Sequence, residues 1–457
     1  MAMCPLFRSF LAKNRTALKI ITVGLAVRLL LLFIAAYTYN HFGWQRLLLG
    51  WDWNMEGFLD YIFWYVSGGE DPQENHGFTQ LFLSGELPYR DWGAAYNMTP
   101  LFLFMLAPFW ALPLGVWGPA IPIVICDALI GVAIYGIGKK FFHDEKKAKM
   151  AGILAAMAPV NLFYVGYLWL NPGIFTFFAI ASLYYLLNDK HDTSAILLGL
   201  AVMSKQVAVI FFPVILLFVL RNRRSYGLLR YFFIFTAICV VISAPFLVIY
   251  PNEYINMLRS RAPRPVTGVY AFPKFNETVS LTALLQYYQI PDKIIGYVGW
   301  VINTYIAFIL ALVLVVLSLE QETRVKRADS QDSSTFFFFS AFAAMTIMIA
   351  LFPLGVYKYY MASLAPFWAL YSVEAGYELS SRKFIGWFSA FSLWAVFNCV
   401  ALFAPRVWNP YLAAFPFIVV FLPRVLRRPS ALIRPLNSLK YLISRTLGAV
   451  MAIFRRF

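Results

Sequence analysis

Eight carboxylates are concentrated in one stretch of the chain, between residues 39 and 97. They are Asp52, Glu56, Asp60, Glu70, Asp71, Glu74, Glu86 and Asp91. An ionised carboxylate held within hydrogen-bond reach of a hydroxyl group can act as a general base. Aromatic residues lie among these carboxylates, including Trp51, Trp53 and Trp64, and they favour an ordered segment at a membrane interface. The stretch is therefore the first candidate for acid–base chemistry.

A second polar stretch, between residues 250 and 293, is basic. It contains Arg259, Arg261, Arg264, Lys274 and Lys293. Guanidinium and ammonium groups bind phosphate oxygens, and they also bind the headgroups of anionic lipids. An acidic and a basic stretch on the same face of a membrane would suit chemistry on an amphiphile with an anionic head.

The usual signatures of soluble enzymes are missing from the sequence. It has no GxxxxGK[ST], HExxH, CxxC or GxSxG motif, and it has only four His and four Cys. Because the cysteines are far apart, a disulfide framework is not expected. The sequence predicts no cofactor and no metal centre, and it leaves open a requirement for a divalent cation, Mg²⁺ or Mn²⁺.

The elements that must position these stretches are strongly apolar. Of the 457 residues, 61% are hydrophobic and only 13% are charged, whereas soluble proteins carry roughly 45–50% apolar and about 25% charged residues. One crossing of a bilayer needs about 20 apolar residues, so the chain is long enough for about a dozen. The composition excludes a soluble enzyme, a secreted disulfide scaffold and a disordered chain. It predicts an all-α polytopic membrane protein that forms a single domain over residues 1–457.

Apolar runs bounded by charges or turn residues predict a bundle of about 11–13 membrane helices. The run at 194–204 is too short to span alone, so we expect it to form a broken pair with 206–220 around Lys205. A further run at 98–117 contains three prolines, and we expect it to enter the outer leaflet without crossing. The other runs lie near 18–38, 119–138, 150–168, 172–187, 229–249, 294–318, 336–352, 359–376, 384–404 and 411–423.

The positive-inside rule sets the orientation of this bundle. With a cytoplasmic N-terminus, 27 of the 38 basic residues face the inside, 10 face the outside and Arg28 lies within the membrane. Both termini are then cytoplasmic, in a cell membrane or in the ER membrane of a eukaryote. The net charge of +16 is explained by this asymmetry and by contact with the lipid bilayer, so nucleic acid is not an expected partner.

The same orientation divides the chain into segments. Residues 39–97 form a first external loop with an interfacial helix near 58–66, residues 250–293 form a second large external loop, and residues 424–457 form a basic cytoplasmic tail. Within the spans, Asp127 is the one clearly intramembrane carboxylate, and Arg28 is its expected partner. A structural ion pair is the favoured interpretation, with a proton relay as the alternative.

One motif in the first external loop resembles a known superfamily. Residues 85–89 read Gly-Glu-Leu-Pro-Tyr, and the sequence Tyr-Asn-Met-Thr-Pro-Leu at 96–101 then enters the membrane. With an acidic residue upstream, this order resembles the first external loop of GT-C glycosyltransferases, polytopic enzymes that use polyprenyl- or dolichyl-phosphate sugars. Within that superfamily the sequence resembles family 87, the polyprenyl-phosphate-mannose-dependent mannosyltransferases.

Three later segments extend the resemblance over most of residues 18–370. Asn171-Pro172 follows a span in the manner of the second external loop. The sequence Gly-Leu-Ala-Val-Met-Ser-Lys at 199–205 is similar to a G-L-A-x-x-x-K segment, and Lys358-Tyr359 before Pro366 is similar to a late K/H-Y-x-x-x-x-x-P segment. Residues 39–69 are longer than the superfamily pattern, which adds candidate carboxylates.

The resemblance implies a hexosyltransferase, with mannose as the favoured sugar. It would move the sugar from a polyprenyl- or dolichyl-phosphate donor to a hydroxyl of a glycan, lipid or protein at the outer or lumenal membrane face. A polyprenyl phosphate is a good leaving group, so its departure needs charge stabilisation more than a general acid. The acceptor hydroxyl needs a carboxylate base, and a single displacement inverts the anomeric centre.

The resemblance also implies roles for particular residues. It places the base upstream of Gly85, where Asp71 is the first candidate because it follows the Gly68-Gly69 turn. Asp52 is the second, because Trp51 and Trp53 flank it with rings that can stack on a sugar, and Glu70 and Glu74 are alternatives.

The expected substrate-loop and donor-phosphate residues follow from the same motifs. The substrate loop would comprise Tyr89, Arg90, Asp91 and Tyr96. The donor phosphate would bind Lys205 and Lys358, with further candidates Arg259, Arg261, Arg264 and Lys274, for which contact with anionic lipid is the alternative. 

Two functions from other classes compete with this interpretation. A transporter or flippase for a lipid-linked glycan would need polar residues along a path through the bundle, and the apolar runs contain few. A channel or scaffold would explain neither polar loop.

Overall fold

The computed structural model describes residues 14–42, 82–83, 85, 88–90, 98–110, 112, 114, 118–222, 225–260, 285, 288–303, 330–351, 358–378, 383–404, 414–416 and 418–419. These residues form helices joined by turns, without a strand among them. The prediction of an all-α protein is confirmed for this part of the chain. The interfacial helix predicted near 58–66 lies outside it.

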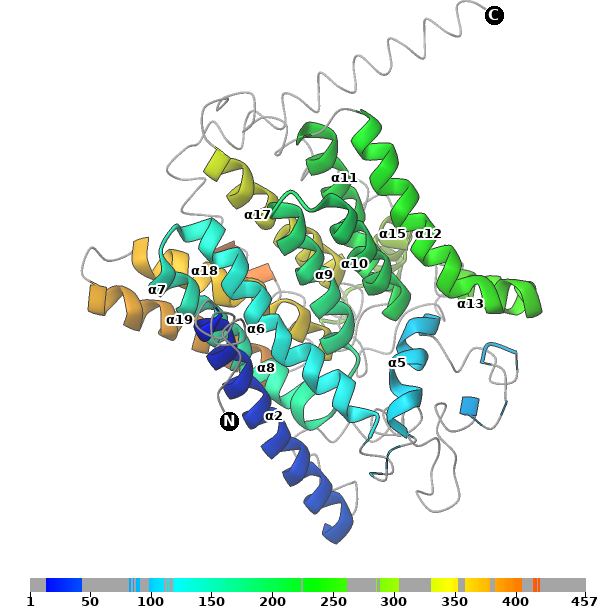
Figure 1. The fold of residues 1–457 in the computed structure, drawn as a ribbon, viewed down its shortest axis with the longest axis horizontal. Helices are drawn as coiled ribbons and strands as arrows, with labels where there is room; N and C mark the ends of the chain where they lie inside the picture. Colours follow the sequence, from blue (N-terminus) through cyan, green and yellow to red (C-terminus); the bar gives the residue numbers. More distant parts are fainter. Residues whose placement is uncertain are drawn as a thin grey trace, which may run out of the picture.

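The helices follow the chain in an order that Figure 1 shows from blue to red. They are α2 (Arg15–Phe42), α5 (Pro100–Trp110), α6 (Ala120–Phe142), α7 (Glu145–Ala156), α8 (Pro159–Asn161), the π-helix η4 (Leu162–Tyr167), α9 (Pro172–Leu187), α10 (His191–Ser204), the 3₁₀-helix η5 (Gln206–Ile210), α11 (Phe211–Asn222), α12 (Ser225–Ile249), α13 (Pro251–Ser260), α15 (Asp292–Asn303), α17 (Ser330–Leu351), the 3₁₀-helix η7 (Lys358–Ser363), α18 (Ala365–Glu378) and α19 (Lys383–Phe403).

Five helical stretches within the described residues are long and apolar enough to cross a bilayer. They are Arg15–Ala35, Ala120–Phe142, Glu145–Tyr167, Gly227–Ile249 and Phe384–Phe403. Four shorter apolar helices accompany them: Pro100–Phe109, Pro172–Leu187, Gln206–Leu216 and Ser340–Ile349. The chain is therefore a polytopic membrane protein, as its composition predicts.

One irregularity predicted from the apolar runs, the break at Lys205, is present, and a second, the partial insertion of 98–117, stays a prediction. Helix α10 ends at Ser204 and α11 follows only after η5, so the expected break falls at Lys205. Helix α5 has 11 residues, which is too short to cross a bilayer that needs about 20 residues. This length fits partial insertion of the proline-containing run at 98–117.

Antiparallel hairpins build the bundle. Helices α6 and α7, α9 and α10, and α18 and α19 pack as neighbouring pairs (Figure 1). The α18–α19 crossing is very close, because a Cβ added at Gly376 would lie 2.3 Å from the backbone nitrogen of Ala390. Only glycine allows the two backbones to approach this closely.

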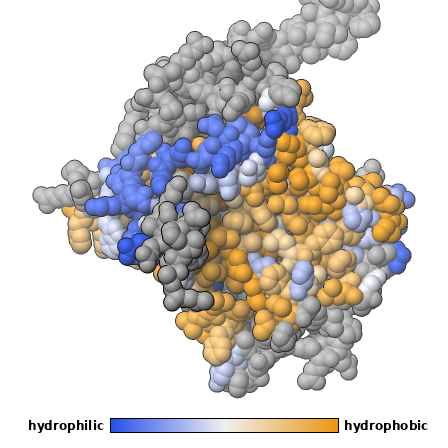
Figure 2. Space-filling model, in the orientation of Figure 1, coloured by the Kyte–Doolittle hydropathy of each residue, from blue (hydrophilic) through white to orange (hydrophobic). Residues whose placement is uncertain are grey.

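Charged residues mark one end of the bundle. Exposed Lys139, Lys146 and Lys190 lie at the turns that join α6 to α7 and α9 to α10, and Arg230 forms an ion pair of 2.5 Å with Asp192 near the start of α10. Figure 2 shows a hydrophilic band above a broad apolar surface. We call the end with these turns the basic end and the opposite end the far end. The cytoplasmic side predicted for the basic end stays a prediction.

Candidate functional site

The far end of the bundle brings together segments that are distant in the sequence. Helices α9 and α10 are antiparallel neighbours joined by a short turn, so the start of α9 at Pro172 and the end of α10 at Ser204 both lie there. A hydrogen bond from Thr99 to Val202 attaches the start of α5 to the same place. A hydrogen bond from Asn171 to Tyr359 brings η7 to this end as well, and one from Tyr89 to the Met98 carbonyl brings the Tyr89 loop. The described parts of the four motif segments therefore share one end.

Tyr89 is held in an unusual backbone conformation. Its φ is 70° and that of Gly85 is 97°, so both residues occupy the left-handed region that non-glycine residues avoid. The Tyr89 side chain is only 3% exposed, and its hydroxyl donates a 2.9 Å hydrogen bond to the Met98 carbonyl. Such strained residues cost of order 1–3 kcal/mol and persist where the surroundings fix them, often at functional sites.

Aromatic rings fix Tyr89 from the other side. Its ring lies 5.2 Å from Phe246 on α12 and 5.0 Å from Tyr254 on α13, measured between centroids. The Tyr254 hydroxyl is hydrogen-bonded to Ser243 at 2.9 Å. Burial raises the pKa of Tyr254, with the Ser243 hydrogen bond opposing the shift, so the phenol stays neutral at physiological pH.

Met98 and Thr99 connect the Tyr89 loop to the break after α10. The Thr99 hydroxyl donates to the Val202 carbonyl at 2.9 Å, and the Lys205 ammonium lies 3.0 Å from the Met98 sulfur. Lys205 has an extended backbone, with φ −157° and ψ 122°, and is 7% exposed. A buried ammonium in an apolar bundle attracts anions more strongly than an exposed one, because the local dielectric constant is lower.

A second polar group lies where α9 begins. The Asn171 amide donates a 3.4 Å hydrogen bond to the Tyr359 hydroxyl of η7, and the Asn171 Oδ1 has no hydrogen-bond partner among the described residues. Two residues earlier, Trp169 has a φ of 51° and is 4% exposed. This loop is therefore a second place where a buried aromatic residue has a left-handed backbone.

Lys358 is bound to the end of another helix. Its ammonium donates hydrogen bonds of 2.7 Å to the Leu402 carbonyl and 2.8 Å to the Ala404 carbonyl. Carbonyls at a helix C-terminus have no partners within the helix and carry partial negative charge, so a cation is stabilising there. Lys358 thus caps α19, and two of its three N–H donors are used in doing so.

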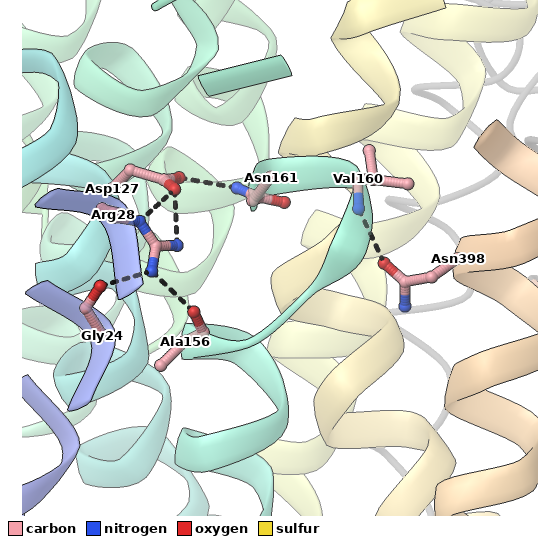
Figure 3. A network of polar contacts seen from close by, with 7 residues as sticks. All are labelled: Gly24, Arg28, Asp127, Ala156, Val160, Asn161 and Asn398. Carbon is pink, nitrogen blue, oxygen red and sulfur yellow. Dashed lines mark hydrogen bonds and ion pairs between the residues drawn. The ribbon is translucent and has the colours of Figure 1, made fainter. Parts of the chain in front are cut away.

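The Arg28–Asp127 ion pair is confirmed and belongs to a larger network, drawn in Figure 3. The Arg28 guanidinium bonds Asp127 through Nε at 2.7 Å, and neither side chain is exposed. It also donates to the Ala156 carbonyl at 2.7 Å, where α7 ends. Asn161 donates to the other Asp127 oxygen at 2.6 Å. The network therefore fixes the interruption between α7 and the π-helix η4.

Comparison with known proteins identifies the family. The sequence model of Glycosyltransferase family 87 matches residues 96–331, which is just over half of the chain. The chain belongs to glycosyltransferase family 87. The resemblance seen in the motifs is thereby confirmed. A comparison with curated proteins finds no match.

Among solved structures, the family 87 chain is similar to the archaeal oligosaccharyltransferase AglB from Archaeoglobus fulgidus, in complex with an inhibitory peptide and a dolichol-phosphate. The sequence identity is 12% and the TM-score is 0.43. The similarity covers 89% of this chain and 56% of that chain, so the family 87 protein spans little more than half of the AglB length.

The structure describes only some of the predicted site residues of this family 87 chain. Tyr89 and Lys205 come together around Met98, Lys358 begins η7 at the far end and caps α19, and Arg90 is exposed beside Tyr89. Arg259 lies on α13, but its side chain is outside the described residues. Also outside them are Asp52, Glu70, Asp71, Glu74, Asp91, Tyr96, Arg261, Arg264 and Lys274. 

The sequence predicts no metal centre and leaves open a divalent-cation requirement, and both stay predictions for the family 87 chain. Among the described residues, no group of three or more His, Cys, Asp or Glu side chains is placed to hold a metal ion. The eight carboxylates of the first external loop are not part of that set, so the question of Mg²⁺ or Mn²⁺ rests on experiment.

Sequence reasoning missed several residues that organise this end of the family 87 bundle. Thr99 lies inside the quoted motif, but its partner Val202 is 103 positions away. Tyr254 carries no motif at all. The break that Arg28 fixes did leave a signal, because Pro159 disfavours a helical conformation at Ala158, and Ala158 has a ψ of 116°.

Proposed function

We propose that this family 87 glycosyltransferase moves a hexose, with mannose favoured, from a polyprenyl- or dolichyl-phosphate donor to a hydroxyl acceptor. The observation that carries the proposal is the meeting of the Tyr89 loop with the buried Lys205 at Met98. It joins two family motifs at one end of a membrane bundle. The long-chain donor would lie in the bilayer with its phosphate at that end.

The reaction is a single displacement. A carboxylate of the first external loop takes the proton from the acceptor hydroxyl, whose oxygen forms a bond to the anomeric carbon. The bond between that carbon and the phosphate oxygen breaks, and the electron pair leaves with the polyprenyl phosphate. Attack from the side opposite the leaving group inverts the anomeric configuration. Asp71 is the first candidate for the base and Asp52 the second, with Glu70 and Glu74 as alternatives.

The basic residues of the far end would stabilise the leaving phosphate. Lys205 is the leading candidate because it is 7% exposed and its ammonium lies 3.0 Å from the sulfur of Met98, whose carbonyl accepts from Tyr89 of the first-loop motif. A charge-assisted hydrogen bond from an ammonium to a phosphate oxygen is strong. Lys358 is the weaker candidate, because it already caps α19. The cluster of Arg259, Arg261, Arg264 and Lys274 would extend the cationic surface.

The proposed site faces the outside or the lumen. The basic end carries Lys139, Lys140, Lys146, Lys147 and Lys149 around the α6–α7 turn, and the positive-inside rule assigns such an end to the cytoplasm. The far end then opens on the outer leaflet. The acceptor, whether glycan, lipid or protein, would approach from that side.

A flippase or transporter is not favoured by the described residues. The buried Arg28 and Asp127 are bonded to each other, to Asn161 and to a backbone carbonyl. Ionisable groups on a transport path normally face a water-filled cavity. This pair instead has 0% exposed surface on both side chains.

A transfer assay tests the proposal. The purified chain in lipid nanodiscs is given a synthetic short-chain polyprenyl-phosphate mannose and three acceptors: an alkyl mannoside, a membrane lipid extract and a hydroxyl-containing peptide. We expect mannose on one acceptor with inverted anomeric configuration by NMR, release of polyprenyl phosphate, and no transfer from GDP-mannose. Movement of the intact donor between leaflets without transfer would support the flippase instead. Repeating the assay with EDTA decides the divalent-cation requirement.

A further inference from the structure

The break at Lys205 leaves a specific gap in the hydrogen bonding of α10. The last four carbonyls of a helix have no partners within it. The Ala201 carbonyl accepts from the Lys205 amide, and the Ser204 hydroxyl donates to the Leu200 carbonyl. The Val202 carbonyl would pair with the Gln206 amide if the helix continued, but the extended backbone of Lys205 prevents this.

Thr99, the residue directly before α5, fills this gap. Its hydroxyl donates to the Val202 carbonyl at 2.9 Å, and the residue is 2% exposed. The bond joins the residue directly before α5 to the residue three positions before Lys205. This hydrogen bond therefore fixes the backbone that carries the Lys205 side chain.

The neighbour of Thr99 holds the other end of the same lysine. The Met98 sulfur lies 3.0 Å from the Lys205 ammonium, and the Met98 carbonyl accepts from the Tyr89 hydroxyl. Thr99 thus binds a backbone carbonyl at the end of α10, and Met98 contacts the ammonium of Lys205. Tyr89 connects this dipeptide to its own loop through the Met98 carbonyl.

We infer that Thr99 is a positioning residue for Lys205, and that it acts on the donor phosphate through that lysine. The inference rests on the proposed function, in which Lys205 binds the phosphate. Loss of one hydrogen bond of this kind weakens a dependent interaction about threefold to tenfold. Thr99→Val keeps the shape of the side chain and removes the hydroxyl, whereas Thr99→Ser keeps the hydroxyl.

A double-mutant cycle on donor binding tests the inference. Dissociation constants for synthetic short-chain polyprenyl phosphate are measured on the full chain in nanodiscs, for the wild type, Thr99→Val, Lys205→Met and the double variant. We expect Thr99→Val to weaken binding about threefold to tenfold alone and to have no further effect in the Lys205→Met chain. Thr99→Ser should restore binding. In transfer assays the donor KM should rise with kcat nearly unchanged.

A matched control separates positioning from general loosening of the bundle. Thr176 on α9 is also a buried threonine, 3% exposed, and its hydroxyl has no partner among the described residues. Thr176→Val should leave the dissociation constant unchanged.

Four results would overturn the inference, and they differ in what else they affect. If Lys205→Met weakens binding but Thr99→Val does not, or if Thr99→Val weakens it equally in the Lys205→Met chain, positioning through Lys205 is wrong and the proposed function stands. If Lys205→Met leaves binding unchanged, both the inference and the phosphate role of Lys205 fail. If the wild type binds no polyprenyl phosphate, the proposed donor class fails with them.

Discussion

Arg28 on α2 and Asp127 on α6 form an ion pair with no exposed surface on either side chain. The guanidinium also holds the Ala156 carbonyl at the end of α7, so one residue joins three helices. A glycine beside the pair shows how closely it is packed, because a Cβ at Gly173 would lie 3.2 Å from the Asp127 Cβ. Helix α9, which starts one residue earlier, is thus positioned directly against this network.

Breaking the ion pair from one side should destabilise the protein. Arg28→Met leaves a buried carboxylate, and Asp127→Leu leaves a buried guanidinium, and such changes cost about 3–5 kcal/mol. The double variant removes both charges and should be distinctly more stable than either single variant. Thermal unfolding in detergent measures this order. Single variants as stable as the wild type would show that the pair does not support the fold.

Lys358→Met should lower stability because Lys358 caps a helix. The substitution leaves the Leu402 and Ala404 carbonyls without their buried donor, at a cost of about 1–3 kcal/mol. The opposite effect would be expected for a buried lysine without such hydrogen bonds, because its replacement with methionine would be favourable. Thermal unfolding decides the structural role, and titration with polyprenyl phosphate decides the phosphate role. Lower stability with unchanged donor affinity would leave Lys358 as a cap only.

Adding a single methyl group at the α18–α19 crossing should lower the stability of the protein. Gly376→Ala places a Cβ 2.3 Å from the Ala390 nitrogen and 2.5 Å from its Cα. Backbone atoms must then move, which typically costs about 1–3 kcal/mol. Gly296→Ala on α15 is the matched control, because nothing lies within 4 Å of its added Cβ, and it should be neutral or slightly stabilising. Equal unfolding temperatures for both variants would contradict the close packing.

The orientation of the bundle predicts which positions an impermeant thiol reagent reaches. In a chain with its native cysteines replaced, Lys274→Cys should be labelled in intact cells, because the positive-inside rule predicts that the second large external loop faces outside. Lys146→Cys at the basic end should be labelled only after permeabilisation. The reverse pattern would place the proposed site in the cytoplasm.

Local patterns in the sequence predicted several elements closely. The apolar run at 172–187 became α9 with the same bounds. The break at Lys205 followed from a run too short to span a membrane. Arg28 and Asp127 were recognisable as partners because charges inside apolar runs must be neutralised. Each of these inferences needed only the residue types in one or two segments.

Contacts that depend on the packing of distant helices could not be predicted. No local pattern pairs the Thr99 hydroxyl with the Val202 carbonyl, or Lys358 with the end of α19, because the partner is a backbone carbonyl that any residue supplies. The left-handed backbone of Tyr89 was equally hidden, since φ above zero is rare for a bulky residue.

The proposed displacement reaction depends most directly on a loop carboxylate that takes a proton from the acceptor hydroxyl. Asp71→Asn keeps the shape of the side chain and removes the base, and general-base assistance is worth about 10²–10⁴ in rate. Asp52→Asn is the paired variant, because Asp52 is the second candidate.

The deciding measurement is the turnover of short-chain polyprenyl-phosphate mannose by the wild type, Asp71→Asn and Asp52→Asn, with donor affinity measured in parallel. We predict that Asp71→Asn lowers kcat by at least about a hundredfold with donor affinity nearly unchanged, while Asp52→Asn mainly raises KM. Normal turnover in Asp71→Asn with collapse in Asp52→Asn would move the base to Asp52. Normal turnover in both variants, and in Glu70→Gln and Glu74→Gln, would contradict the mechanism.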